Sequence, residues 1–149
     1  MNTRIDRPQM LTIERSAIMR AVKGRGNAST EGRMLSILRG AHLTGWRRHL
    51  KITGTPDFVF PAAHVAVMVH GCFWHGCPRH YRSPSHNSSY WSAKIARNIT
   101  RDRLVQARLR RDGWSVLTFW EHDLKREDVV VRRLRKALRA RGYPDFVGL

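Results

Sequence analysis

The feature that most restricts the fold of this chain is a pair of apolar segments just before its midpoint. Val65–His70 (VAVMVH) is apolar almost throughout, as in a central strand that is covered on both faces. Asp57–Phe60 (DFVF) precedes it, and only the four residues PAAH lie between the two segments. A connection this short favours a hairpin, so the pair predicts two adjacent strands inside a sheet.

The segments on either side of this pair predict helices, except for two that predict further strands. Ahead of the pair, residues 12–22 look helical, and Ser29 can cap a second helix whose dipole Glu31 favours. Residues 45–51 predict a strand only weakly, because GWRRHLK alternates poorly. After the pair we expect a helix, a strand and a helix, in this order: Tyr90–Arg111, Trp114–Trp120 and Lys125–Arg141. The order predicts an α/β sandwich with a mixed sheet flanked by helices, in a single domain of residues 1–149.

The dominant compositional feature is a net charge of +17, from 28 basic residues against 11 acidic ones. Such an excess attracts polyanions, and most of it is arginine, whose planar fork suits phosphates and base edges. A GC-rich genome would also inflate arginine without any function. Because the basic residues are spread along the whole chain, we expect a folded basic surface that binds nucleic acid.

Two absences in the sequence bear on location. No run approaches the roughly eighteen apolar residues of a membrane span, and the start, MNTRIDRPQM, lacks the apolar stretch of a secretory signal. We therefore expect a cytoplasmic protein without membrane contact. The two cysteines would stay reduced there, which favours metal binding or plain burial over a disulfide.

The register of the hairpin decides which side chains meet. We expect Phe60 to pair with Val65. Asp57 then faces Met68, and His70 lies roughly 7–8 Å away on the same face. A carboxylate and an imidazole would converge at the open end of the pair, whereas a slip of one residue would place them on opposite faces.

Asp57 is a candidate ligand for Mg²⁺, which keeps most of its waters and uses few protein carboxylates. The metal can polarise a phosphate and lower the pKa of a bound water, while His70 or His75 moves the proton. Asp102 lies on the apolar stripe of the long helix, where it can orient a catalytic histidine or form an interior ion pair with arginine. The alternative for Asp57 is an exposed aspartate at the start of a strand.

The segment after the central strand contains soft metal ligands. Cys72-x4-Cys77-x2-His80 offers three zinc ligands within nine residues. We expect His122 as the fourth, because a structural clip gains most by tying a loop to a distant element. Two other histidines compete for this position: His75 and His86. The alternative is that both cysteines are ordinary core residues.

Phe73 and Trp74 stand between these cysteines, in a loop with glycine and histidine neighbours. Large aromatic side chains in such a loop either anchor it to the core or are offered to a ligand. Their spacing does not decide between the two.

Taken together, these residues resemble the very short patch repair (Vsr) DNA mismatch endonucleases. The resemblance covers Arg15 to Leu124 and rests on five segments: STEGRM, GTPDFVF, VMVHGCFWHGCPRH, YWSAKIARNITRDR and GWSVLTFWEHDL. It implies a restriction-endonuclease-like fold with a metal-dependent site related to the PD-(D/E)xK nucleases. It also implies recognition of a T:G mismatch left by deamination of 5-methylcytosine, and a nick 5′ of the mismatched thymine.

The resemblance also implies roles for particular positions. Asp57 matches a magnesium-binding aspartate, and the main-chain carbonyl of Val69 matches a second metal ligand. His70 and His75 match the catalytic histidines, and Glu31 is a further acidic active-site residue.

Two more groups follow from the same resemblance. Three aromatic residues match positions that wedge between base pairs beside the mismatch: Phe73, Trp74 and Trp91. Four residues fall at or near structural zinc positions: Cys72, Cys77, His80 and His122. His122 stands where the better-known pattern has cysteine, and the loop ligands are spaced differently from some members, so the implied site is Cys2His2.

The expected partner is double-stranded DNA with a T:G mismatch, with residues 1–24 as an arm against it and mismatch-repair proteins as further partners. One active site per chain fits a monomer that nicks one strand. We expect the protein in the cytoplasm of a bacterium, associated with the nucleoid. A non-catalytic, zinc-stabilised DNA-binding module is the main alternative, and an RNA-binding protein of the translation machinery is another. The expected proximity of Asp57, His70 and His75 favours a catalytic function over both alternatives.

Overall fold

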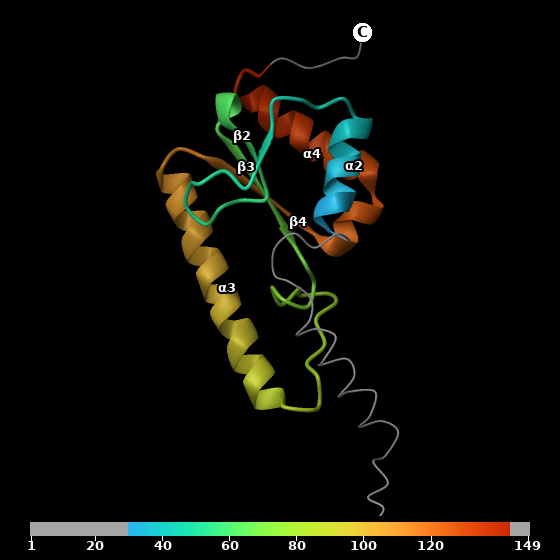
Figure 1. Cartoon of the computed structure of the whole chain (residues 1–149), viewed down its shortest axis with the longest axis vertical. Coiled ribbons are helices and arrows are strands. Elements are labelled where there is room, and N and C mark those ends of the chain that lie inside the picture. Colours follow the sequence, from blue (N-terminus) through green and yellow to red (C-terminus); the bar gives the residue numbers. More distant parts are fainter. Residues whose placement is uncertain (1–29, 144–149) are drawn as a thin grey trace, which may run out of the picture.

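The computed structural model describes residues 30–143, which form a four-stranded mixed sheet between helices (Figure 1). The strands lie in the order in which they occur in the chain: β1 (Arg47–Arg48), β2 (Phe58–Phe60), β3 (Val65–His70) and β4 (Ser115–Trp120). The β1–β2 and β2–β3 pairs are antiparallel, whereas β3 and β4 are parallel. The predicted mixed sheet is confirmed. The helix expected over residues 12–22 and the arm of residues 1–24 lie outside the described residues.

The hairpin register agrees with the prediction, because Phe60 pairs with Val65 and Phe58 with Val67. The connection itself is a 3-10 turn over Pro61–Ala63, and His64 ends it in the left-handed region at φ 51°. Continuing the register by one pair places Asp57 opposite Met68.

Helices cover both faces of the sheet (Figure 1). Helices α2 (Glu31–Gly40) and α4 (Glu127–Ala140) lie on one face, and α3 (Ser88–Arg111) lies on the other. All six residues of β3 are buried, and the first five alternate between two apolar clusters. Val65, Val67 and Val69 pack with residues of α2 and α4, whereas Ala66 and Met68 pack with Leu109 of α3. The nearly continuous apolar run therefore forms a strand that is covered on both sides.

Several boundaries differ from the prediction. Helix α2 follows Thr30, which makes no side-chain capping bond, and Ser29, the expected cap, lies outside the described residues. The strand expected over residues 45–51 contains only Arg47–Arg48.

The last helix begins two residues later than expected, at Glu127, because a 3-10 helix η2 (Glu121–Lys125) occupies the chain before it. The Asp123 carboxylate accepts a hydrogen bond from the backbone N–H of Trp120 at 2.8 Å, which turns the chain directly after β4.

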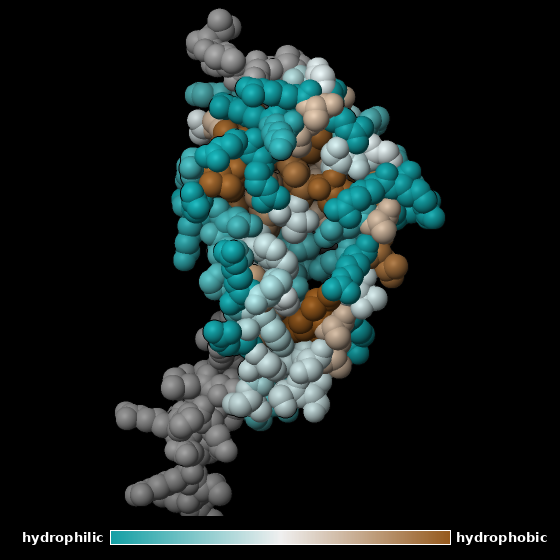
Figure 2. Space-filling model, turned by 180° about the vertical axis from the view of Figure 1, so that it is seen from behind, coloured by the Kyte–Doolittle hydropathy of each residue, from teal (hydrophilic) through white to brown (hydrophobic). Residues whose placement is uncertain are grey.

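The face seen in Figure 2 is mainly hydrophilic, with smaller apolar areas between the polar side chains. Within residues 30–143, no helix is long and apolar enough to cross a membrane. The many polar side chains on this face are consistent with the charge of +17.

Candidate active site and metal centres

Asp57 lies directly before β2 and contacts the neighbouring strand β3. Its Oδ2 accepts a hydrogen bond from the backbone N–H of Val69 at 2.7 Å. Because the N–H and C=O of one strand residue point to the same side, the Val69 carbonyl also faces β2. Burial raises the pKa of Asp57 to about 6, and the Glu31 carboxylate adds to this effect.

A first group of side chains, the carboxylate cluster, consists of Glu31, His49 and Asp57, whose ligand atoms all lie within 4.8 Å of one another. Glu31 is only 3% exposed, although it opens helix α2. Its Oε2 lies 2.8 Å from Nη2 of Arg48 and 3.0 Å from Nε2 of His49. The structure therefore brings Glu31 to Asp57 and adds His49, which sequence reasoning missed.

The position of His49 follows from strand pairing. Arg48 pairs with Phe58, and the next residue along, His49, donates its backbone N–H to the Asp57 carbonyl at 3.3 Å. A histidine directly after two arginines of a weak strand gave no signal in the sequence. Only the partner strand reveals which side chains it meets.

A second group, the histidine cluster, consists of His70, His75 and Asp102. Nδ1 of His75 lies 2.6 Å from Oδ2 of Asp102, and the His70 and His75 rings are stacked with centroids 3.9 Å apart. Burial, and then the charge of His75, lowers the pKa of His70 to about 4. His70 is therefore neutral near pH 7. Asp102 can hold His75 in the tautomer that leaves Nε2 free to accept a proton.

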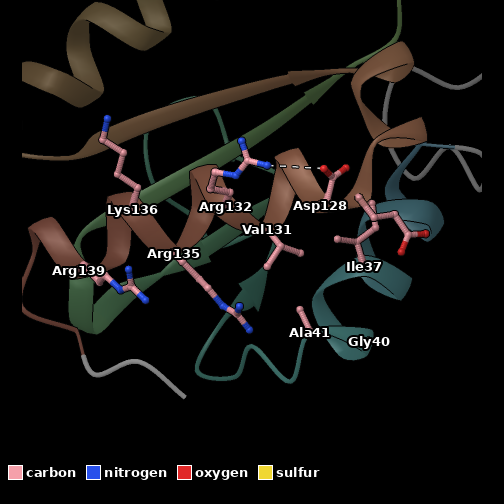
Figure 3. Close-up of a pocket in the computed structure, with 10 residues that line it drawn as sticks. Ile37, Gly40, Ala41, Asp128, Val131, Arg132, Arg135, Lys136 and Arg139 are labelled. Carbon is pink, nitrogen blue, oxygen red and sulfur yellow. Dashed lines mark ion pairs between the residues drawn. The ribbon is translucent and has the colours of Figure 1, made fainter. Parts of the chain in front are cut away.

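Asp57 and the histidine cluster line one cavity of about 480 Å³, which lies between β3 and α3. Its lining includes five of the predicted site residues together with one arginine: Asp57, Val69, His70, His75, Asp102 and Arg101. A larger cavity of about 900 Å³ lies between α2 and α4 (Figure 3). Arg132, Arg135 and Lys136 of α4 lie at its rim, and none of the predicted site residues lines it.

A third group, the thiol cluster, consists of Cys72, Cys77 and His122. Nδ1 of His122 lies 3.4 Å from Sγ of Cys72 and 3.6 Å from Sγ of Cys77. Tetrahedral Zn²⁺ would hold sulfur and nitrogen ligands about 3.6 Å apart, so the donor set fits this metal. Burial and the neighbouring Cys77 raise the pKa of the Cys72 thiol to about 11, so a metal would have to displace its proton.

The predicted fourth ligand, His122, thus lies beside both thiols, whereas His80, the third ligand predicted from the loop spacing, lies further away. His80 is exposed, and its ring centroid lies 4.5 Å from that of His122. It therefore lies beside the thiol cluster without belonging to the three close ligands. Of the two rivals of His122, His75 contacts Asp102 in the histidine cluster, and His86 is exposed.

The aromatic residues of the loop pack against the start of α3. Trp91 is fully buried, and Phe73 is 8% exposed, with their ring centroids 5.3 Å apart. Trp74 is half-buried, its centroid lies 5.8 Å from that of Trp91, and Nζ of Lys94 lies 5.3 Å from its ring centroid. Among the described residues, the buried Nε1 of Trp74 has no hydrogen-bond partner. In this conformation Trp91 supports the other two rings rather than facing solvent.

The loop is also fixed to the middle of α3. Nδ2 of Asn98 donates a hydrogen bond to the Trp74 carbonyl at 2.9 Å. Gly76 has φ 62°, and a Cβ there would lie 2.7 Å from Cδ1 of Ile99. Only glycine allows both this backbone conformation and this close approach, so the path of the loop depends on Gly76.

Comparison with known proteins identifies the family. A family model described as DNA mismatch endonuclease Vsr matches residues 10–81. The type II nicking enzyme V.XorIIP of Xanthomonas oryzae pv. oryzae is 37% identical over 129 residues, or 83% of this chain and 91% of that enzyme. The DNA mismatch endonuclease Vsr of Escherichia coli K12 is 37% identical over 112 residues, or 74% of this chain and 71% of that enzyme.

A further relative matches a shorter segment of the chain at higher sequence identity. The type II nicking enzyme V.NaeI of Lentzea aerocolonigenes is 54% identical over 68 residues, which span 46% of this chain and 41% of that enzyme. Together with the mixed sheet and the three clusters, these matches define the class of protein. The chain belongs to the Vsr family of DNA mismatch endonucleases.

Proposed function

We propose that the chain is a DNA endonuclease that nicks one strand 5′ of the thymine in a T:G mismatch, as in very short patch repair. The observation that carries this proposal is the single cavity lined by Asp57, His70, His75 and Asp102. It combines a carboxylate for a divalent ion with imidazoles for proton transfer, and each of these accelerates the hydrolysis of a phosphodiester at neutral pH.

Asp57 and the Val69 carbonyl would hold Mg²⁺, with Glu31 beside them as a further acidic residue. When bound, the ion polarises the phosphate and lowers the pKa of a water. The hard oxygen donors of this set suit Mg²⁺, which is bound through few protein carboxylates. The thiol cluster would hold a structural Zn²⁺, with His80 completing four ligands after a small movement of its ring.

His75 would move the proton. A water attacks phosphorus, one phosphorus–oxygen bond of the backbone breaks, and the proton of the water passes to Nε2 of His75. Asp102 stabilises the imidazolium that forms, since its carboxylate lies 2.6 Å from Nδ1. The neutral His70 ring, stacked on His75, keeps that ring in place without adding a charge, and the leaving oxygen takes up a proton from the site or from solvent.

The mismatch would be read by the aromatic side chains. A T:G pair unstacks more easily than a matched pair, so inserted rings meet the lowest cost there. Phe73 and Trp74 lie between the two zinc cysteines and would form the wedge, with Trp91 behind them. The unpartnered Nε1 of Trp74 favours a change of position when DNA binds.

The proposed partner is double-stranded DNA bound by a monomer in the bacterial cytoplasm, with mismatch-repair proteins as further partners. Several relatives are named type II nicking enzymes, which favours nicking of one strand over double-strand cleavage. The non-catalytic DNA-binding module remains the second candidate, because charge, zinc and aromatic residues alone would satisfy it.

The test is relaxation of a supercoiled plasmid that carries one T:G mismatch, with Mg²⁺ present. The matched plasmid of the same sequence is the control. We expect conversion to open circles only with the mismatch and the metal. Binding to the mismatch without any nick would instead support the DNA-binding module.

A further inference from the structure

The carboxylate cluster contains a donor that the proposed mechanism leaves unused, the imidazole of His49. We propose that His49 is a direct ligand of the ion at Asp57, so that this site prefers a divalent first-row transition ion such as Mn²⁺ to Mg²⁺. The inference rests on the proposed function in one respect, since it takes Asp57 as a metal ligand.

The backbone already holds His49 beside Asp57. Pairing of Arg48 with Phe58 places the two residues opposite each other on adjacent strands, and the His49 N–H donates to the Asp57 carbonyl at 3.3 Å. The side-chain ligand atoms of the carboxylate cluster lie within 4.8 Å of one another. Ligands about 2.1 Å from one ion lie at most about 4.2 Å apart, so only small side-chain movements are needed.

The charges of this cluster also favour a cation. Glu31 and Asp57 are two adjacent carboxylates in a largely buried place, and their repulsion needs compensation. Arg48 supplies part of it, because its Nη2 lies 2.8 Å from Oε2 of Glu31. Nε2 of His49 lies 3.0 Å from the same oxygen, so this ring nitrogen already faces a carboxylate, while 37% of the side chain is exposed.

The type of donor then sets the preference among metals. Mg²⁺ takes oxygen ligands and gives up its waters reluctantly, whereas imidazole suits transition ions. Two carboxylates and one imidazole therefore bind a transition ion through nitrogen. Mg²⁺ would retain a water at that position instead and would hardly use His49.

Metal binding without DNA tests this inference. Zinc-loaded protein, whose thiol cluster is occupied, is titrated calorimetrically with Mn²⁺ and with Mg²⁺. We expect His49→Ala to weaken Mn²⁺ binding about tenfold and to change Mg²⁺ affinity by less than about twofold. His42→Ala, which removes an exposed imidazole outside the three clusters, should match the wild type. Equal Mn²⁺ affinity in His49→Ala and wild type would overturn the inference.

A spectroscopic measurement keeps the inference testable if the variant is unstable. Electron spin-echo modulation of the Mn²⁺-loaded wild type should show coupling to a nitrogen-14 nucleus. The coupling should vanish in His49→Ala and persist in His42→Ala. No coupling in the wild type, or a coupling that survives in His49→Ala, would overturn the inference, because in the second case the nitrogen belongs to another residue.

Different results would contradict the proposed function and this inference. Asp57→Asn should lose the binding of both ions, and Mg²⁺ binding that persists there would contradict the metal site itself. If Mg²⁺ supports mismatch nicking but His49→Ala binds Mn²⁺ as the wild type does, only the inference is wrong.

Discussion

The carboxylate cluster, which includes Asp57, and the histidine cluster differ in the charged groups that surround their buried side chains. In the carboxylate cluster, burial raises the pKa of Asp57 to about 6, and the cation of Arg48 lies 2.8 Å from the buried Glu31 carboxylate. In the histidine cluster, burial keeps His70 neutral and lowers its pKa to about 4. The carboxylate cluster is therefore suited to a bound cation, and the histidine cluster to proton transfer.

The clusters also differ in how the chain assembles them. His70 and His75 lie on one strand and its loop, and α3 adds Asp102 from the face behind them. The carboxylate cluster needs the start of α2, the end of β1 and the start of β2 to meet. Asp57 belongs to the carboxylate cluster and also lines the cavity that the histidine cluster lines, so it links the two.

Removing Asp57 tests both sides at once and should have the largest effect. We expect Asp57→Ala to lower the nicking rate by about 10³-fold or more, because the metal contributes several kcal/mol to the transition state. Affinity for mismatched DNA, measured by fluorescence anisotropy, should stay close to the wild-type value. Near-normal nicking by this variant would show that the active site lies elsewhere.

Removing His75 tests the histidine cluster alone. His75→Ala should slow nicking by about 10²-fold or more, the usual contribution of a positioned acid–base group, and His70→Ala should be nearly as damaging. Mg²⁺ affinity and zinc content should be unchanged in both variants. His86→Ala, at an exposed position, is the matched control. A loss of zinc in His75→Ala would mean that His75 is a zinc ligand.

The hairpin and its site residues could be predicted because the evidence for them is local. The apolar run Val65–His70 and the short connection before it determine the register, which places Asp57 next to β3. His49 could not be predicted in the same way, since β1 contains only two residues and its neighbours are set by tertiary pairing. The burial of Trp91 could not be predicted either. A large aromatic side chain suits both the apolar stripe of α3 and a wedge between base pairs.

The thiol cluster holds the loop that carries His75, so its loss should affect the histidine cluster more than the carboxylate cluster. Cys72→Ser should lower zinc content from about one per chain and reduce the melting temperature, since the binding energy of a structural zinc is folding energy. Elemental analysis and calorimetry measure both. His122→Ala should behave in the same way. If His122→Ala keeps its zinc but His86→Ala loses it, the fourth ligand is His86 rather than His122.

The pH dependence of metal binding separates the two clusters by titration. Because the pKa of Asp57 is raised to about 6, its carboxyl binds a proton below that pH, and Mg²⁺ must displace it. Mg²⁺ affinity should then fall about tenfold per pH unit below about pH 6 and level off above it. His70, with a pKa of about 4, should not contribute in this range. Calorimetry in two buffers checks the proton release, and a flat profile would contradict the assignment.

The smallest effect is expected from the aromatic wedge. Trp74→Ala should reduce the preference for T:G over matched duplex several-fold, by about 1–2 kcal/mol of lost stacking, without changing zinc content. Phe73→Ala should do the same more mildly. Affinities for the two duplexes give the ratio for each variant. An unchanged ratio would mean that these rings only anchor the loop.

The most direct test of the whole account is the position of the cut. A short duplex with one T:G mismatch, labelled on each strand in turn, is incubated with zinc-loaded protein and Mg²⁺, and the products are resolved at single-nucleotide length. The account predicts one cut, in the thymine strand and immediately 5′ of the mismatched thymine, and no cut in the matched duplex. Cleavage of both strands, or of the matched duplex to the same extent, would contradict it.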